Sequence, residues 1–176
     1  MAKNKLVLTI YKRFLSRYGP QGWWPVFDEN TGKIEYHKNN YEIPTNEQQQ
    51  FEIGVGAILT QNAAWKNVEK SLYELKNQNV LIKNGIEKIN NEKLAGLIKS
   101  SVYHNQKTKK LKLFVEMLKK KEKITRGGLL ETWGIGPETA DSILLYAYKM
   151  PVFVVDAYTK RIFLRIGLVC FSTFEK

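Results

Sequence analysis

The chain has 176 residues, and its 28 Lys and Arg exceed its 17 Asp and Glu, which gives a formal net charge of +11. A content of 43% hydrophobic and 12% aromatic residues is enough to bury a core and excludes a disordered tail. The single cysteine, Cys170, excludes an internal disulfide framework and any zinc or iron–sulfur site built from four cysteines of this chain.

The sequence carries no membrane or secretion signal. Its longest apolar runs are too short to cross a bilayer, and lysines interrupt the apolar residues of the N-terminal segment. We therefore expect a cytoplasmic protein with no membrane partner. A codon bias toward A·T explains why Lys outnumbers Arg, but it does not explain the surplus of positive charge. That surplus favours a polyanionic partner, most often nucleic acid.

Hydrophobic spacing predicts helices along most of the chain, beginning with residues 5–18. Residues 26–42 carry a turn signal between short apolar stretches, which indicates a small β-hairpin or an irregular excursion. We expect Thr45 to cap the next helix, which runs to about Asn62, with Gln48 as its capping-box partner.

Two glycines within that helix, Gly54 and Gly56, indicate a close approach to a neighbouring element. The same periodicity predicts further helices over 65–75, 92–100, 107–120, 126–133, 137–149 and 157–167. Many short helices with tight connections indicate an all-α domain.

The connection between the helices at 126–133 and 137–149 holds the most informative motif. Gly134, Ile135 and Gly136 allow a sharp turn that leads directly into a new helix. Such a turn points main-chain N–H groups outward, where they can bind a DNA phosphate without reading sequence. The pattern is that of a helix-hairpin-helix motif, and the alternative is an ordinary helix pair whose glycines serve packing.

Asp156 precedes the last predicted helix and has two interpretations. An aspartate at this position is a good N-cap. A carboxylate beside a motif that grips DNA can also stabilise a developing positive charge and orient water. The residues alone leave both interpretations open.

Five short motifs in order carry a family resemblance. They are Gly22-Trp23-Trp24-Pro25, Ile58-Leu59-Thr60-Gln61-Asn62, Tyr103-His104-Asn105-Gln106-Lys107, Gly134-Ile135-Gly136 and Val155-Asp156. Together they resemble the endonuclease III superfamily of helix-hairpin-helix DNA glycosylases. Within it the chain is most similar to the bacterial 3-methyladenine DNA glycosylases of endonuclease III-like type. The resemblance implies a multi-helix, two-lobed all-α fold.

The resemblance also implies a domain organisation. Residues 1–22 would form an N-terminal helix of the second lobe, and residues 23–150 a helical lobe that ends in the helix-hairpin-helix motif at about 126–149. Residues 151–176 would begin the second lobe and carry the catalytic aspartate. The family normally continues with more helices, so we expect this C-terminal lobe to be incomplete.

Family resemblance assigns Asp156 as the catalytic residue. Bifunctional members carry a lysine nucleophile two residues after the second glycine of the hairpin, where this chain has Glu138. No Schiff base can form there, which implies a monofunctional glycosylase that cuts the N-glycosidic bond and lacks lyase activity. Glu138 would instead suit the positive end of its helix dipole.

The implied substrate is an alkylated purine, most of all 3-methyladenine. Its ring is cationic, and electron-rich aromatic faces attract a cation. We therefore expect the flipped base to lie in a pocket of Trp23, Trp24 and Trp65. The alternative is that these tryptophans belong to the core.

Further residues are implied to contact DNA. Gln61 would fill the gap left by the flipped base, and Val102 or Tyr103 would wedge into the opposite strand. Lys107 and Arg161 would line the phosphate track, although lysines on a solvated face are the commoner case. Gln61 also has a structural alternative as a polar residue at a helix C-terminus.

The expected partner is double-stranded DNA carrying a damaged base, bound by a monomer near the nucleoid. No iron–sulfur cluster is expected with one cysteine, no other metal site is expected, and a monovalent cation at the hairpin is compatible with the motif. Two rival functions stay open: the same chemistry on an oxidised or mismatched base, and a non-catalytic module that grips DNA through the hairpin.

Overall fold

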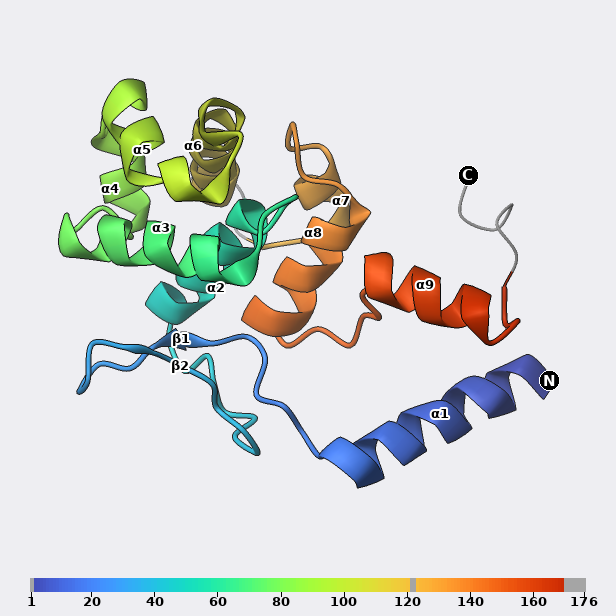
Figure 1. Cartoon of the computed structure of the whole chain (residues 1–176). Helices are drawn as coiled ribbons and strands as arrows, with labels where there is room; N and C mark the ends of the chain where they lie inside the picture. Colours follow the sequence, from blue (N-terminus) through green and yellow to red (C-terminus); the bar gives the residue numbers. More distant parts are fainter. Residues whose placement is uncertain (1, 121–122, 170–176) are drawn as a thin grey trace.

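The computed structural model describes residues 2–120 and 123–169, and it is mostly helical (Figure 1). The elements in chain order are α1 (Ala2–Tyr18), β1 (Val26–Phe27), β2 (Ile34–Glu35), α2 (Glu47–Leu59), α3 (Trp65–Asn77), α4 (Lys83–Lys88), α5 (Asn91–Leu97), a 3-10 turn η1 (Lys99–Ser101), α6 (His104–Lys120), α7 (Arg126–Leu130), α8 (Pro137–Ser142), a π-helical turn η2 (Ile143–Ala147) and α9 (Ala157–Arg165). The two strands pair antiparallel as a small hairpin. The predicted all-α fold and the predicted hairpin are both confirmed.

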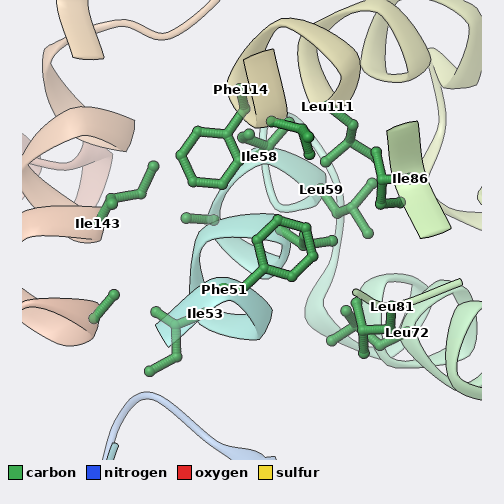
Figure 2. Packing of buried hydrophobic residues seen from close by; sticks show 14 of the residues in the cluster. Phe51, Ile53, Ile58, Leu59, Leu72, Leu81, Ile86, Leu111, Phe114 and Ile143 are labelled. Carbon is green, nitrogen blue, oxygen red and sulfur yellow. The ribbon is translucent and has the colours of Figure 1, made fainter. Parts of the chain in front are cut away.

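Helix α2 forms the centre of the helical lobe. Its residues from Phe51 to Leu59 are all buried, and all but Glu52 are apolar, so other elements surround the helix (Figure 2). The Phe114 ring of α6 stacks on Phe51 with 6.2 Å between ring centroids. A Cβ at Gly54 would meet that Phe114 ring at 2.6 Å, which confirms the close approach predicted there.

The N-terminus of α2 corrects one sequence prediction. Asn46, not Thr45, is the N-cap, and its side chain accepts from the Gln49 N–H at 2.9 Å. The Gln49 side chain in turn accepts from the Thr45 N–H at 2.8 Å. Thr and Asn are both good caps, and each has a glutamine three residues further on. The Gln48 side chain, the expected partner of Thr45, instead donates to the Leu81 carbonyl at 2.5 Å.

Other boundaries differ by about one turn. Helix α6 begins three residues earlier than predicted, and α4 was not predicted because its six residues are too few to show a period. The predicted helix at 137–149 changes into the π-helical turn η2 after Ser142. The polar hairpin and the short helices otherwise follow the predicted order.

Helix α1 lies outside the helical lobe, and α9 extends on the same side of the view (Figure 1). The apolar side chains of α1 are exposed: Leu6, Leu8, Tyr11, Phe14, Leu15 and Tyr18. The assignment of this helix to a second lobe stays a prediction. None of the helices in the described part of the chain is both long and apolar enough to cross a membrane.

Glu52 attaches the hairpin to α2. Its side chain is only 3% exposed, and its carboxylate accepts from the Phe27 N–H at 2.7 Å. Burial raises the pKa of Glu52 to about 7, and this outweighs the opposing effects of that hydrogen bond and of Lys76. The folded chain therefore holds a proton on Glu52 under conditions in which the unfolded chain has lost it.

This raised pKa predicts how stability depends on pH. The stability that protonated Glu52 contributes is fully present below its ordinary pKa of 4.5 and is lost as the pH rises through about 7. The loss is on the order of 3 kcal/mol. The glutamine of Glu52→Gln can still accept from the Phe27 N–H but does not titrate. We therefore expect this variant to abolish the fall in stability between about pH 4.5 and about pH 8. Glu47→Gln, at an exposed position of the same helix, should keep it.

Urea denaturation of the three proteins at about pH 4.5 and about pH 8 checks this expectation. Parallel pH profiles for the wild type and Glu52→Gln would contradict it.

Candidate functional site

Helices α7 and α8 form a rigid hairpin. Thr125 caps α7, where its hydroxyl accepts from the Gly128 N–H at 3.1 Å. The Arg126 guanidinium bridges to Asp141 of α8 through two bonds, of 2.6 Å and 3.0 Å. A two-bond pair of this kind fixes orientation as well as distance. The two helices are therefore held at one angle, with the glycine turn at their junction.

The two glycines of the turn have different roles. Gly134 has a φ of +84°, and a Cβ there would meet the Lys110 side chain at 2.5 Å. Gly136 is extended, is exposed and caps α8 ahead of Pro137, and a Cβ there would meet nothing within 4 Å. The fold thus requires glycine at 134. At 136 it leaves open space beside the first N–H groups of α8, which lack intrahelical partners.

Gln61 is bound to this turn instead of pointing outward. Its Nε2 donates to the Gly134 carbonyl at 3.0 Å and to the Thr139 hydroxyl at 2.9 Å. Its Oε1 accepts from Lys110 Nζ at 2.5 Å. The cap of α2 is Thr60, so Gln61 is not the C-cap residue either. Its insertion into DNA stays a prediction, and it would require these bonds to break.

Asp156 is the N-cap of α9, and its Oδ1 accepts from the Thr159 N–H at 2.6 Å. The structural role proposed for it is confirmed. Its negative charge also acts on one residue of α8 and one of η2. Burial and then the charge of Asp156 raise the pKa of Glu138, while Lys160 lowers it. Burial and the same charge raise the pKa of Tyr146. The charge of Asp156 therefore acts on residues of both α8 and η2.

The three tryptophans form one aromatic cluster. The ring centroids lie 4.9 Å apart for Trp23 and Trp24, 5.0 Å for Trp23 and Trp65, and 5.6 Å for Trp24 and Trp65. Tyr146 extends the cluster, with its ring 5.6 Å from that of Trp24. Tyr146 thus contacts the tryptophan cluster, and the charge of Asp156 acts on it.

A cavity of about 860 Å³ opens beside this cluster. Trp23, Trp24 and Tyr146 line it, together with residues of α1 and of the segment after β2. Trp23 is 38% exposed, whereas Trp24 is buried and its ring nitrogen lies where a Cβ of Gly56 would come within 2.9 Å. Trp65 is half-buried behind the pair and does not line the cavity.

The proposed wedge residues are on the surface. Val102 and Tyr103 follow η1 and are 45% and 59% exposed. Their φ angles are +60° and +47°, which is unusual for two consecutive residues other than glycine. On α9, Arg161 is exposed and lies 4.9 Å from the centroid of the Tyr158 ring.

Lys107 contradicts its assignment to the phosphate track. Its side chain is 1% exposed, and Nζ donates to the Leu59 carbonyl at 2.7 Å and to the Ser101 carbonyl. An ammonium enclosed in this way cannot contact a phosphate. Lys107 lies on the apolar face of α6 with Leu111 and Phe114, and this spacing could have indicated its burial.

Residues 55–171 match the family model of the HhH-GPD superfamily base excision DNA repair proteins. The chain belongs to this superfamily. A Methanocaldococcus jannaschii protein, provisionally named a DNA repair glycosylase, is 39% identical over 184 residues. The match covers 96% of this chain and 74% of that protein. The resemblance predicted from the five motifs is thereby confirmed.

Solved structures of HhH-GPD type show the same fold. The crystal structure of Helicobacter pylori 3-methyladenine DNA glycosylase (MagIII) bound to 1,N6-ethenoadenine is 29% identical. Its TM-score is 0.70, over 96% of this chain and 75% of that chain. A non-covalent endonuclease III–DNA complex has a TM-score of 0.74 at 18% identity, over 97% of this chain and 72% of that chain. The endonuclease III-like fold is therefore confirmed.

Within this HhH-GPD protein, sequence reasoning missed Tyr146 and the Arg126–Asp141 pair. Tyr146 lies ten residues before Asp156 in the predicted helix, but periodicity does not show which way its ring points. The one cysteine of the chain, Cys170, cannot supply the four thiolates of an iron–sulfur cluster, and it lies outside the described residues. A monovalent cation at the hairpin stays a prediction, and the Gly134 carbonyl there already accepts from Gln61.

Because a Cβ at Gly136 would meet open space, a substitution there should weaken DNA binding more than it lowers stability. Gly136→Ala should lower the free energy of unfolding by less than about 1 kcal/mol, the preference of an N-cap for Gly over Ala. Its methyl group would hold a phosphate away from the turn. One lost charge-assisted hydrogen bond then weakens affinity for duplex DNA about tenfold.

Fluorescence anisotropy with a labelled duplex at one fixed salt concentration measures this effect. Gly96→Ala in α5, where a Cβ also meets nothing within 4 Å, is the matched control and should bind like the wild type. Equal affinities for both variants would show that the turn does not contact DNA.

Proposed function

We propose that this HhH-GPD protein is a monofunctional DNA glycosylase that flips and hydrolytically removes an alkylated purine, most of all 3-methyladenine. The observation that carries the proposal is the position of Asp156. Its negative charge acts on Glu138 of the helix that follows the glycine turn and on Tyr146, whose ring centroid lies 5.6 Å from that of Trp24. An acid and an aromatic pocket on one side of a DNA-binding motif are what this reaction needs.

One named relative supports this choice of substrate, and a second supports the glycosylase activity. One is a 3-methyladenine glycosylase bound to an ethenoadenine, and it is 29% identical over nearly the whole of this chain. The other carries the name of a DNA repair glycosylase at 39% identity. The likeness to these two proteins therefore favours purine excision by this chain, with a modified adenine as the first substrate to test.

The chemistry follows from the charge of the lesion. A 3-methylated adenine is a cation, so it leaves with the electron pair of the glycosidic bond and needs no proton from the protein. Positive charge then develops at the sugar, where an anionic Asp156 would stabilise it. Water adds to the same sugar carbon, and its proton goes to the carboxylate or to solvent. The products are a free base and an abasic site.

Glu138 supports hydrolysis without strand cleavage. It occupies the place of the lysine nucleophile of bifunctional relatives, and a carboxylate cannot form a Schiff base with the sugar. Burial and the charge of Asp156 raise the pKa of Glu138, whereas Lys160 lowers it. The reaction requires no metal or organic cofactor.

Double-stranded DNA is the partner that suits the charge and the hairpin. The net charge of +11 favours binding to a polyanion, and main-chain donors at the turn hold phosphate without reading bases. Each step needs one copy of the chain, so we expect a monomer acting on chromosomal DNA in the cytoplasm.

The first test is release of free base from a methylated duplex. We expect the wild type to release 3-methyladenine above a protein-free control. Asp156→Asn should lower the rate at least about a hundredfold while the fold stays intact, because asparagine caps a helix as well as aspartate does. Asp28→Asn is the matched control, since Asp28 also accepts from loop N–H groups but lies in the hairpin excursion.

Chromatography of the released bases gives the rate, and borohydride treatment should trap no covalent complex. Undiminished release by Asp156→Asn would refute the catalytic assignment. No release at all by the wild type, with DNA binding retained, would favour a non-catalytic module.

A second test concerns the aromatic pocket. Trp23→Leu removes the most exposed of the three indoles and should slow excision of the cationic base more than excision of neutral hypoxanthine. A desolvated cation–π contact is worth about 2 kcal/mol, so we expect the ratio of the two rates to fall up to about thirtyfold. An unchanged ratio would mean that Trp23 does not contact the base.

A further inference from the structure

The buried ammonium of Lys107 joins the C-terminal ends of two helical elements, α2 and η1. Nζ donates to the carbonyl of Leu59, the last residue of α2, and to the carbonyl of Ser101, the last residue of η1. The last carbonyls of a helix have no intrahelical donor, so each of these oxygens needs a partner. Lys107 supplies both from a single group.

The residues that follow the Ser101 carbonyl are strained and exposed. Val102 is β-branched and has a φ of +60°, and Tyr103 has a φ of +47°. Backbone of this kind persists only where the surrounding structure holds it, and it gathers at functional sites. The Ser101 hydroxyl donates to the Ile98 carbonyl at 2.7 Å, which fixes η1 on the other side of the turn.

The cost of burying Lys107 indicates that the contact serves more than packing. Burial lowers the pKa of Lys107 to about 8, with a further lowering from Lys110 nearby. Apolar residues on this face of α6 would stabilise the core at lower cost than an ammonium. What an apolar residue cannot do is direct two carbonyl groups toward one point. The charge therefore determines the positions of the backbone at Leu59 and Ser101.

We propose that Lys107 is a positioning residue, whose ammonium ties the exposed turn at Val102 and Tyr103 to the end of α2 so that the turn is held ready to enter damaged DNA. This inference rests on the proposed function and on the wedge role that the family resemblance implies for Val102 or Tyr103. Lys107 acts through the turn and does not touch DNA. A gap in the duplex is the feature that such a turn would recognise.

Helix α6 contains a matched control. Lys112 also donates from Nζ to two carbonyls, those of Glu87 and Ile89 at the end of α4. It therefore makes the same kind of contact from the same helix, at a place remote from the turn. Lys107→Met and Lys112→Met each remove one such contact while keeping most of the side-chain volume.

The experiment measures binding of the full chain to two labelled duplexes. One carries a tetrahydrofuran abasic-site analogue and the other is the same sequence without it. We expect the wild type to prefer the abasic duplex, and Lys107→Met to reduce this preference about tenfold with binding to the intact duplex unchanged. Lys112→Met should keep the wild-type preference for the abasic duplex, even if it lowers the free energy of unfolding by as much as Lys107→Met does.

A double-mutant cycle tests whether Lys107 acts through the turn. Tyr103→Ala should itself reduce the preference for the abasic duplex. Added to Lys107→Met, it should then cause little further loss, because both changes disable the same element. Fully additive losses would overturn the proposal, as would equal preferences in Lys107→Met and Lys112→Met.

If Lys107→Met does not fold, Lys107→Arg and Lys112→Arg replace the two variants. The guanidinium is larger and planar, so it would displace the carbonyls in the closed site and lower the preference at position 107 only. An equal preference in both arginine variants would then overturn the proposal. None of these measurements requires base release, so a failed glycosylase assay and a failed positioning role are separate results.

Discussion

The all-round burial of α2 is the constraint on which the rest of the structure depends. No face of this helix is exposed along Phe51–Leu59, so every neighbouring element must present a complementary surface. Helices α3, α6 and α8, the turn η2 and strand β1 all pack on it. Gly54 and Gly56 bring Phe114 and Trp24 close to its axis. Helix α2 thus supports both the α7–α8 hairpin and the aromatic cluster.

Polar contacts concentrate where α2 ends. Lys107 binds the Leu59 carbonyl, and Gln61, two residues further on, binds the hairpin at Gly134 and Thr139. Lys110 then joins Gln61 from α6. A low-dielectric surrounding strengthens such a network when every member is paired. The end of α2 therefore connects two turns, one that follows Ser101 and one at Gly134.

Much of the fold could be predicted because its signals are local. The helix spacing, the hairpin turn, the glycine pair and the cap at Asp156 each depend on a few neighbouring residues. The cap of α2 was predicted one residue too early because Thr45 and Asn46 are both suitable and only the packed helix selects between them. The family motifs added the expected site, in which Trp24 contacts both Trp23 and Tyr146, and the charge of Asp156 acts on Tyr146.

The sequence by itself determined that this chain forms short helices, a glycine turn suited to phosphate and a carboxylate at a helix start, since these properties belong to neighbouring residues. Only the tertiary structure decided what each charged side chain contacts. Lys107 and Lys109 lie two residues apart on α6, yet the first is enclosed and the second lies 4.3 Å from the centroid of the Trp133 ring. Their difference arises because the packing of α6 against α2 sets which face of the helix is covered, and that depends on residues far away in the chain.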